Sequence, residues 1–163
     1  MEMTHEQLLT LIDERAAADP VFAADVAERR DAPIAAALSV GRTRVRPRLI
    51  TERGVISGLG PIEGEALLQG LEGFASSVLP PEHPLAAYHA GIKRIIGWLK
   101  PPSEGVDIGD PLTANLLGTL AALNTPGITT GRVSALLAMA HEPDPIDVAS
   151  VSAALNQREK ENA

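Results

Sequence analysis

Five arginines lie within twelve residues, and they are the side chains whose type and spacing best suit binding chemistry. Four of them alternate with other residues, and the set is Arg42, Arg44, Arg46, Arg48 and Arg53. In an extended chain, alternate side chains project from one side and lie ~6.6 Å apart. A row of guanidinium groups with that spacing can bind phosphates or the carboxylates of a partner protein.

Several interpretations of this arginine row stay open. The row could be a solvated strand edge whose charge blocks pairing, or it could neutralise acidic sections of its own chain. It could also bind an acidic protein or nucleic acid, although the acidic chain and the scarcity of aromatic residues argue against nucleic acid. We expect a protein partner and a binding site formed by Arg42, Arg44, Arg46, Arg48, Leu49, Ile50 and Arg53.

The other residues that could do chemistry are not arranged for it. The histidines form no i,i+4 pair and no HExxH motif, which argues against a helical zinc site. The glycine run at 58–64 lacks the spacing of a phosphate loop, and Ser57 is not in a G-x-S-x-G motif. We predict no catalytic residue, metal or cofactor, because the sequence offers no anchored site. A pocket that holds His89 with a carboxylate nearby would revive the enzyme hypothesis.

The composition predicts one domain with a core that is poor in aromatic side chains. The chain has 163 residues, 45% of them apolar, and only two Phe, one Tyr and one Trp. The absence of Cys excludes disulfides and thiol chemistry. No apolar run is long enough to span a membrane and no signal peptide is visible, so we expect cytoplasmic synthesis and no membrane contact.

The formal net charge of −7 is distributed unevenly along the chain. Residues 34–100 carry five acids and eight bases, whereas the sections before and after them each carry eight acids and three bases. We expect a single helical domain over residues 1–163. Its possible subdivisions are the N-terminal helices at 1–40, a basic section at 41–100 and a helical section at 101–163.

Capping signals predict an all-α fold of about seven to nine helices. Thr4 and Gln7 have the spacing of a capping box. Three Asp-Pro pairs, at 19–20, 110–111 and 144–145, each predict an N-cap followed by Pro at the first helical position. These signals place compact helices along most of the chain.

Two segments depart from ordinary helix patterns. Residues 42–50 alternate with a period of two and contain Pro47, which predicts an extended segment, either an edge strand or an ordered arm. A helix that begins at Pro61 contains Gly64, Gly70 and Gly73, and each glycine costs ~1 kcal/mol relative to Ala. That cost indicates either close approach of another backbone or a poorly optimised helix.

The last two predicted helices, within 129–140 and 146–158, resemble a helix–turn–helix in outline. A recognition helix needs polar or basic residues at its exposed start. Here that start carries Asp144, Asp147 and Ser150, and its carboxylates would repel phosphates. We therefore expect ordinary packing of the two helices, and we keep an acidic nucleic-acid-binding regulator as the alternative function.

Two blocks of sequence, at residues 41–74 and 105–155, carry a resemblance to known proteins. They contain an R-T-R arm, a G-x-D-x-G-x-P-like loop and a terminal segment that ends in PDP. Together they resemble a group of small uncharacterised proteins of tailed bacteriophages and prophages. The sequence departs from the pattern of the group at Met139-Ala140-His141, where Leu-Ala-Glu is more common.

The resemblance implies a phage or prophage origin and supplies no catalytic residue. We expect a structural or tail-assembly protein of a phage particle, present in the virion or in the host during assembly. Its arginine segment would bind another phage structural protein or a second copy of the chain.

Overall fold

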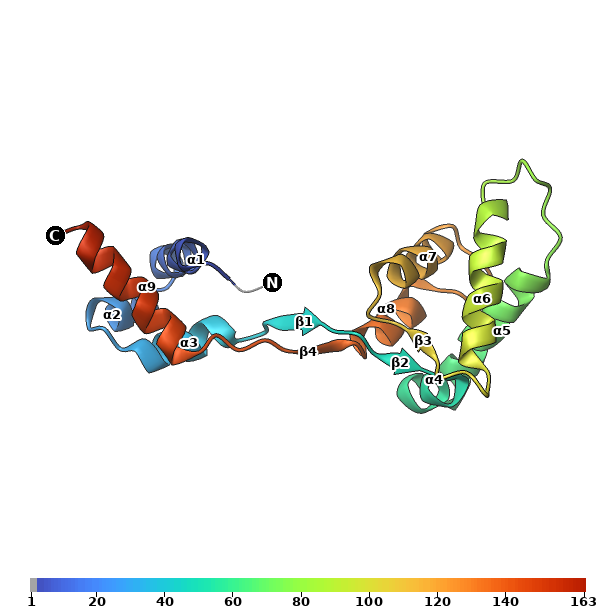
Figure 1. The fold of residues 1–163 in the computed structure, drawn as a ribbon, viewed down its shortest axis with the longest axis horizontal. Helices are drawn as coiled ribbons and strands as arrows, with labels where there is room; N and C mark the ends of the chain where they lie inside the picture. Colours follow the sequence, from blue (N-terminus) through green and yellow to red (C-terminus); the bar gives the residue numbers. More distant parts are fainter. Residues whose placement is uncertain (1–2) are drawn as a thin grey trace. The chain divides into compact units, whose positions relative to one another are not determined.

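A computed structural model describes residues 3–163, and it confirms the predicted all-α class. The described part contains nine α-helices and one short 3-10 helix (Figure 1). They are α1 (His5–Ala18), α2 (Pro20–Ala27), α3 (Asp31–Ser39), α4 (Glu52–Leu59), α5 (Pro61–Ser76), η1 (Ala86–Tyr88), α6 (His89–Leu99), α7 (Pro111–Ala122), α8 (Thr130–Ala138) and α9 (Val148–Glu161).

Four short strands accompany the helices and form two separate pairs. The strands are β1 (Thr43–Val45), β2 (Leu49–Ile50), β3 (Val106–Asp107) and β4 (His141–Pro143). β1 pairs with β4, and β2 pairs with β3 in antiparallel orientation. The predicted extended segment at 42–50 is confirmed, because it contains both β1 and β2.

Contacts divide the chain into two units. Unit 1 consists of the residues up to Arg44 and from Pro143 onwards, and unit 2 is Val45–Glu142. The chain passes from unit 1 to unit 2 after Arg44 and returns to unit 1 after Glu142. Unit 2 is therefore an insertion between two parts of unit 1.

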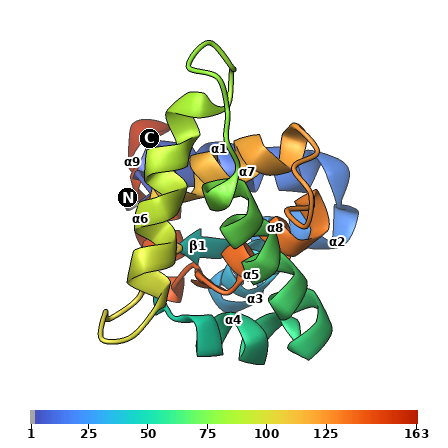
Figure 2. The ribbon, with the colours of Figure 1, turned by 90° about the vertical axis from the view of Figure 1, so that its right-hand side faces the viewer.

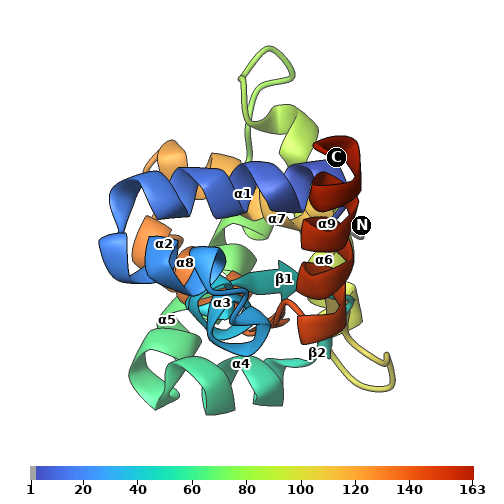
Figure 3. The same ribbon diagram turned by 90° about the vertical axis from the view of Figure 1, so that its left-hand side faces the viewer.

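Unit 1 is a ring of four helices (Figure 3), and buried side chains from these helices form an apolar core of its own. α1 packs against α2 and α9, and α3 packs against the same two helices. The predicted capping box at the start of α1 is confirmed, because Thr4 and Gln7 exchange hydrogen bonds. The buried side chains of this core include Leu8, Ile12, Phe22, Ile34, Leu38, Val151 and Leu155.

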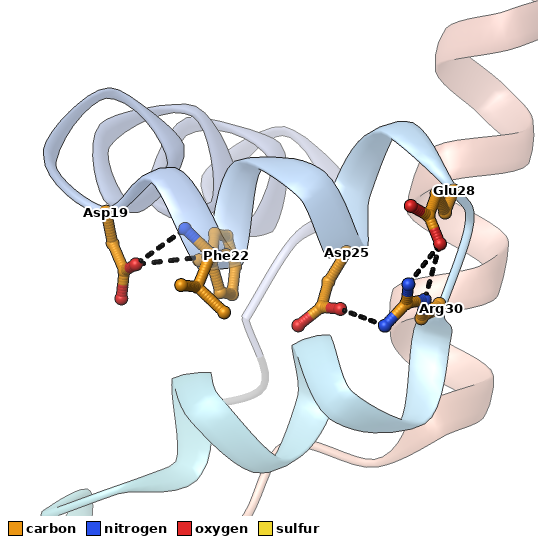
Figure 4. A network of polar contacts seen from close by, with 6 residues as sticks. Asp19, Phe22, Asp25, Glu28 and Arg30 are labelled. Atoms are coloured by element: carbon orange, nitrogen blue, oxygen red, sulfur yellow. Dashed lines mark hydrogen bonds and ion pairs between the residues drawn. The ribbon is translucent and has the colours of Figure 1, made fainter.

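Acidic side chains organise the turns of unit 1. Asp19 accepts hydrogen bonds from the main-chain N–H groups of Val21 and Phe22, so the predicted N-cap of α2 is confirmed (Figure 4). Beyond α2, Arg30 binds the carboxylates of Asp25 and Glu28 (Figure 4). The hydrogen bond with Glu28, and its charge, raise the pKa of the Arg30 guanidinium. The turn between α2 and α3 is thus fixed by charged hydrogen bonds.

Unit 2 holds α4 to α8 around a second core (Figure 2). α5 packs against α4, α6 and α8, and α7 packs against α8. The predicted N-cap of α7 is confirmed, because Asp110 accepts a hydrogen bond from the N–H of Leu112. Core side chains come from all five helices and include Val55, Leu67, Leu71, Ile92, Ile95, Leu117, Leu120 and Val133.

The glycines of α5 divide into two kinds. A Cβ on Gly64 would lie 2.9 Å from the Cα of Ile56 in α4, and one on Gly70 would lie 2.8 Å from the carbonyl carbon of Gly127. Both glycines therefore allow another part of the backbone to approach α5 closely, which is the first of the two explanations predicted from the sequence. A Cβ on Gly73 would have no neighbour within 4 Å, so the other explanation, poor optimisation, applies there.

One expectation for the C-terminal section was wrong. The third Asp-Pro pair does not open the last helix, because α9 is capped by Asp147, which accepts a hydrogen bond from the N–H of Ser150. The last two helices belong to different units: α8 lies in unit 2 and α9 in unit 1, and β4 lies between them in the sequence.

None of the helices in residues 3–163 combines the length and the apolar character that crossing a membrane requires.

Candidate functional site

The arginine segment lies between two other stretches of the chain and is hydrogen-bonded to both. At one end, the N–H of Asp144 donates to the carbonyl of Arg42 at 3.1 Å within unit 1. In unit 2, the N–H of Arg46 donates to the carbonyl of Ala140 at 3.0 Å. Farther on, β2 pairs with β3, with Leu49 opposite Asp107. Main-chain contacts thus hold the segment along its length.

Asp107 fixes the stretch that leads into β2. Its Oδ1 accepts hydrogen bonds from the N–H of Arg48 at 2.8 Å and from the N–H of Gly109 at 2.9 Å. The N–H of Ile108 donates in turn to the carbonyl of Arg48 at 3.0 Å. One carboxylate therefore ties the 105–109 loop to the residue that follows Pro47.

Two glycines in this loop allow its backbone to touch the arginine segment. A Cβ on Gly105, which has a φ of +118°, would lie 2.6 Å from the carbonyl oxygen of Ile50. A Cβ on Gly109 would overlap the carbonyl oxygen of Arg46. Any larger residue at Gly109 would push the loop and the segment apart.

The side chains of the segment do not form the expected free row of guanidinium groups. Arg42 binds the carboxylate of Asp144 at 2.8 Å, and Arg46 binds that of Glu142 at 2.7 Å. Arg44 also has a partner. Neutralisation of the chain's own acidic residues, one of the interpretations that the sequence left open, therefore describes Arg42 and Arg46. Half-exposed pairs of this kind contribute ~0.2–1 kcal/mol each.

The other predicted site residues lie at the unit 2 end of the segment. Arg48 donates to the main-chain carbonyl of Met139, and the side chain of Leu49 is 56% exposed. The prediction that Ile50 binds a partner at the surface was wrong, because its side chain packs into the core of unit 2 and is 5% exposed. Arg53 lies on α4 with an exposed side chain, and within residues 3–163 it makes no hydrogen bond or ion pair.

A shallow groove of about 380 Å³ lies between β2 and α4 in unit 2. Residues 48–51, Gly54, Ser57, Gly58 and Met139 line it. Of these described residues, only Arg48 is charged, so the groove is apolar with a positive edge. We call this feature the β2–α4 groove. Three of the predicted site residues, Arg48, Leu49 and Ile50, contribute to it.

The segments that build the groove correspond to the sequence motifs quoted for the resemblance. The 105–109 loop supports β2, and the stretch from Met139 to Asp144 lies beside the arginine segment. Sequence reasoning missed Asp107, Gly109 and Met139 as parts of this site. The signal that could have found the first two is the G-x-D-x-G spacing, because a carboxylate between two glycines suits a loop that touches another backbone.

His89 contacts Ser77 and Phe74 in unit 2. Its Nε2 lies 3.0 Å from the Oγ of Ser77, and its ring contacts the edge of Phe74 with centroids 4.8 Å apart. The Ser77 hydroxyl donates its proton to the carbonyl of Phe74 at 2.6 Å, so it cannot also donate to the imidazole. The contacts of His89 within the described residues include no carboxylate. The contact between Ser77 and His89 joins the end of α5 to the start of α6.

Comparison of the chain with protein-family models, with curated proteins and with solved structures found no match.

Proposed function

We propose that this chain is a structural or assembly protein of a phage or prophage and that it acts by binding another protein through the β2–α4 groove. The resemblance of residues 41–74 and 105–155 to small proteins of tailed phages supports the phage origin. The groove supports the mode of action, because it exposes apolar surface beside a strand edge. In this proposal the chain is made in the bacterial cytoplasm and joins the particle during assembly.

The observation that carries the proposal is the exposure of Leu49 beside the groove. Its side chain is 56% exposed, although the neighbouring Ile50 is buried and both belong to a strand held firmly by β3. Scattered exposed apolar residues are common, but this one borders a groove whose backbone is positioned by three separate segments. Such positioning suits a surface that another protein must recognise.

Quantitative mass spectrometry of purified phage particles from the source tests the proposal. The unaltered chain should be present in the particles, or in their assembly intermediates, at a fixed ratio to the major structural protein. Leu49→Asp should reduce that ratio by roughly tenfold or more, because a desolvated carboxylate at a contact costs at least as much as a lost hot spot.

Val78→Asp is the matched control, because Val78 is 96% exposed on the loop that follows α5 and lies outside the groove. It should leave the ratio unchanged. Particles and intermediates that lack the chain, or that take up both variants equally, would contradict the proposal.

A further inference from the structure

We infer that the β2–α4 groove binds an extended segment of its partner, which pairs with the main chain of Leu49 and places a carboxylate beside Arg48 and Arg53. This inference rests on the proposed function, and it adds the chemistry of the partner. Three features carry it: the free edge of β2, the apolar lining of the groove and the uncompensated positive charge at its border.

The hydrogen-bond pattern of β2 shows which way its main chain points. The N–H of Ile108 donates to the carbonyl of Arg48, and Leu49 is opposite Asp107 in the register. In an antiparallel pair, hydrogen-bonded positions alternate with positions whose polar groups face outward. The N–H and C=O of Leu49 therefore point away from β3. In the described part of the chain, β3 is the strand that pairs with β2, so its other edge is available to an added strand.

The groove next to this edge offers apolar contact. Leu49 is exposed, and Met139 lies against Gly58 closely enough that a Cβ there would overlap its Sδ and Cε. A methionine side chain is flexible and adapts to the shape of a neighbour. A partner strand can thus pair with Leu49 on one side and place alternate apolar side chains in the groove.

The positive charge at the border of the groove indicates which residues flank the apolar side chains of the partner strand. Arg48 uses one guanidinium N–H for the carbonyl of Met139, and its other N–H groups have no acceptor within residues 3–163. Arg53 is free in the same range and lies one helical turn before Ser57, which lines the groove. No carboxylate belongs to the described lining. A partner segment with an acidic residue would supply the missing charge.

A second copy of this chain fits the groove less well. If β2 of one copy paired with β2 of another, both edges would bring Arg48 and Arg53, and the described lining of neither groove would bring a carboxylate. Like charges across an interface oppose association. The inference therefore commits to a different protein as the source of the strand.

Titration of the isotope-labelled full chain with designed peptides, followed by NMR, tests this chemistry without phage particles. The first peptide alternates Val and Thr and has Glu at both ends. The second replaces each Glu by Lys, and the third keeps Glu but carries N-methyl groups on alternate amides, which remove the donors needed for strand pairing. The Arg53→Gln chain is titrated in parallel, because it removes one positive charge from an exposed position.

The Glu-ended peptide should bind and shift the amide signals of Leu49, Gly54 and Gly58. The Lys-ended peptide should bind about tenfold more weakly at low salt, and this difference should narrow at ~1 M salt, where the screening length is ~3 Å. Arg53→Gln should weaken the Glu-ended peptide only. The N-methylated peptide should not shift the Leu49 amide.

Equal binding of the Glu-ended and N-methylated peptides would overturn strand pairing, and equal binding of the Glu-ended and Lys-ended peptides would overturn the acidic requirement. Absence of binding by the Glu-ended peptide would overturn the inference as a whole. A salt-insensitive dimer that dissociates on Leu49→Asp substitution would assign the groove to a second copy. None of these outcomes depends on whether the chain is found in particles, so they are separate from the test of the proposed function.

Discussion

The two units of this chain differ in the residues that hold their helices together. Unit 1 contains a single glycine, Gly41, and all the other glycines of the chain lie in unit 2. In unit 1, charged side chains join the helices: Arg29 binds Glu159 of α9, and Arg158 binds Asp13 of α1. Unit 2 also has such an ion pair, between Arg132 of α8 and Glu63 of α5, but there glycines bring backbones into direct contact as well.

This difference teaches how a core with few aromatic residues can still be tightly packed. Long polar side chains can bridge helices from the rim and leave the core to aliphatic residues, as in unit 1. In unit 2, Gly64 and Gly70 have no side chain, so α4 and the loop at Gly127 can approach α5 closely. Aliphatic side chains are then large enough to fill the remaining space. Unit 2 should therefore respond most strongly to added atoms, and unit 1 to altered charge.

The largest effect is expected from Gly109→Ala. The added methyl group would overlap the carbonyl oxygen of Arg46, and backbone cannot move aside as a flexible side chain would. We expect the free energy of unfolding to fall by about 3 kcal/mol. Urea unfolding followed by the fluorescence of Trp98, the one tryptophan and a residue of unit 2, measures it. Gly118→Ala, which has no neighbour within 4 Å, is the control, and equal midpoints for the two variants would refute the backbone contact.

A pair of substitutions in α5 sharpens the same contrast with effects of opposite sign. Gly70→Ala should destabilise unit 2 by about 2 kcal/mol, because its Cβ would meet the main chain at Gly127. Gly73→Ala should stabilise it by ~1 kcal/mol, because alanine favours the helix and meets nothing. Thermal unfolding followed by Trp98 fluorescence gives both signs. The explanation fails if the two variants shift the midpoint in the same direction.

Acid should affect unit 1 before unit 2. Hydrogen bonds from the hydroxyl and the N–H of Ser150 lower the pKa of Asp147 below its ordinary value of 3.8. A carboxyl group whose pKa is lower in the folded state stabilises that state above its ordinary pKa. This contribution disappears as the pH falls through the lowered value. The cap of α9 should therefore weaken below about pH 4.

Far-UV circular dichroism and Trp98 fluorescence, recorded between neutral pH and about pH 2, separate the two units in this experiment. Helix content should fall before the fluorescence changes. Asp147→Asn keeps an acceptor that does not titrate, so it should make the loss of helix content less steep. Coincident transitions that Asp147→Asn leaves unaltered would count against this assignment.

The smallest effect is expected from a single charge at the rim of unit 1. Arg158→Gln removes the ion pair with Asp13, whose atoms lie 2.6 Å apart, and should cost ~0.5 kcal/mol. Lys160→Gln is the control, because Lys160 makes no ion pair within residues 3–163. Urea unfolding followed by circular dichroism measures the difference. A larger cost for Lys160→Gln would show that net charge, and not the pair, matters.

Local signals in the sequence were sufficient for most of the helices. The capping box at Thr4 and the Asp-Pro pairs at 19–20 and 110–111 act on the residues beside them, so their effects can be read from a short window. Asp144 shows the limit of such signals. It has the same local sequence as the true caps, but Arg42, far away in the chain, binds its carboxylate.

The candidate site was only partly predictable for the same reason. Pro47 and the alternating arginines were enough to predict an extended segment. The strands that pair with it, β3 and β4, have two and three residues, too few for a periodic pattern. The partners of the arginines could not be identified either, because ion pairs between distant segments leave no spacing in the sequence.

The insertion of unit 2 into the sequence of unit 1 has a consequence for how such a chain can change in evolution. In the sequence of unit 1, residues Val45–Glu142 stand where a loop would connect α3 to α9. The bond from the N–H of Asp144 to the carbonyl of Arg42 closes that loop at its base. A unit inserted in this way can be lengthened, shortened or replaced without changing the order of the helices in unit 1. The sequences of unit 1 and unit 2 are therefore free to evolve at different rates.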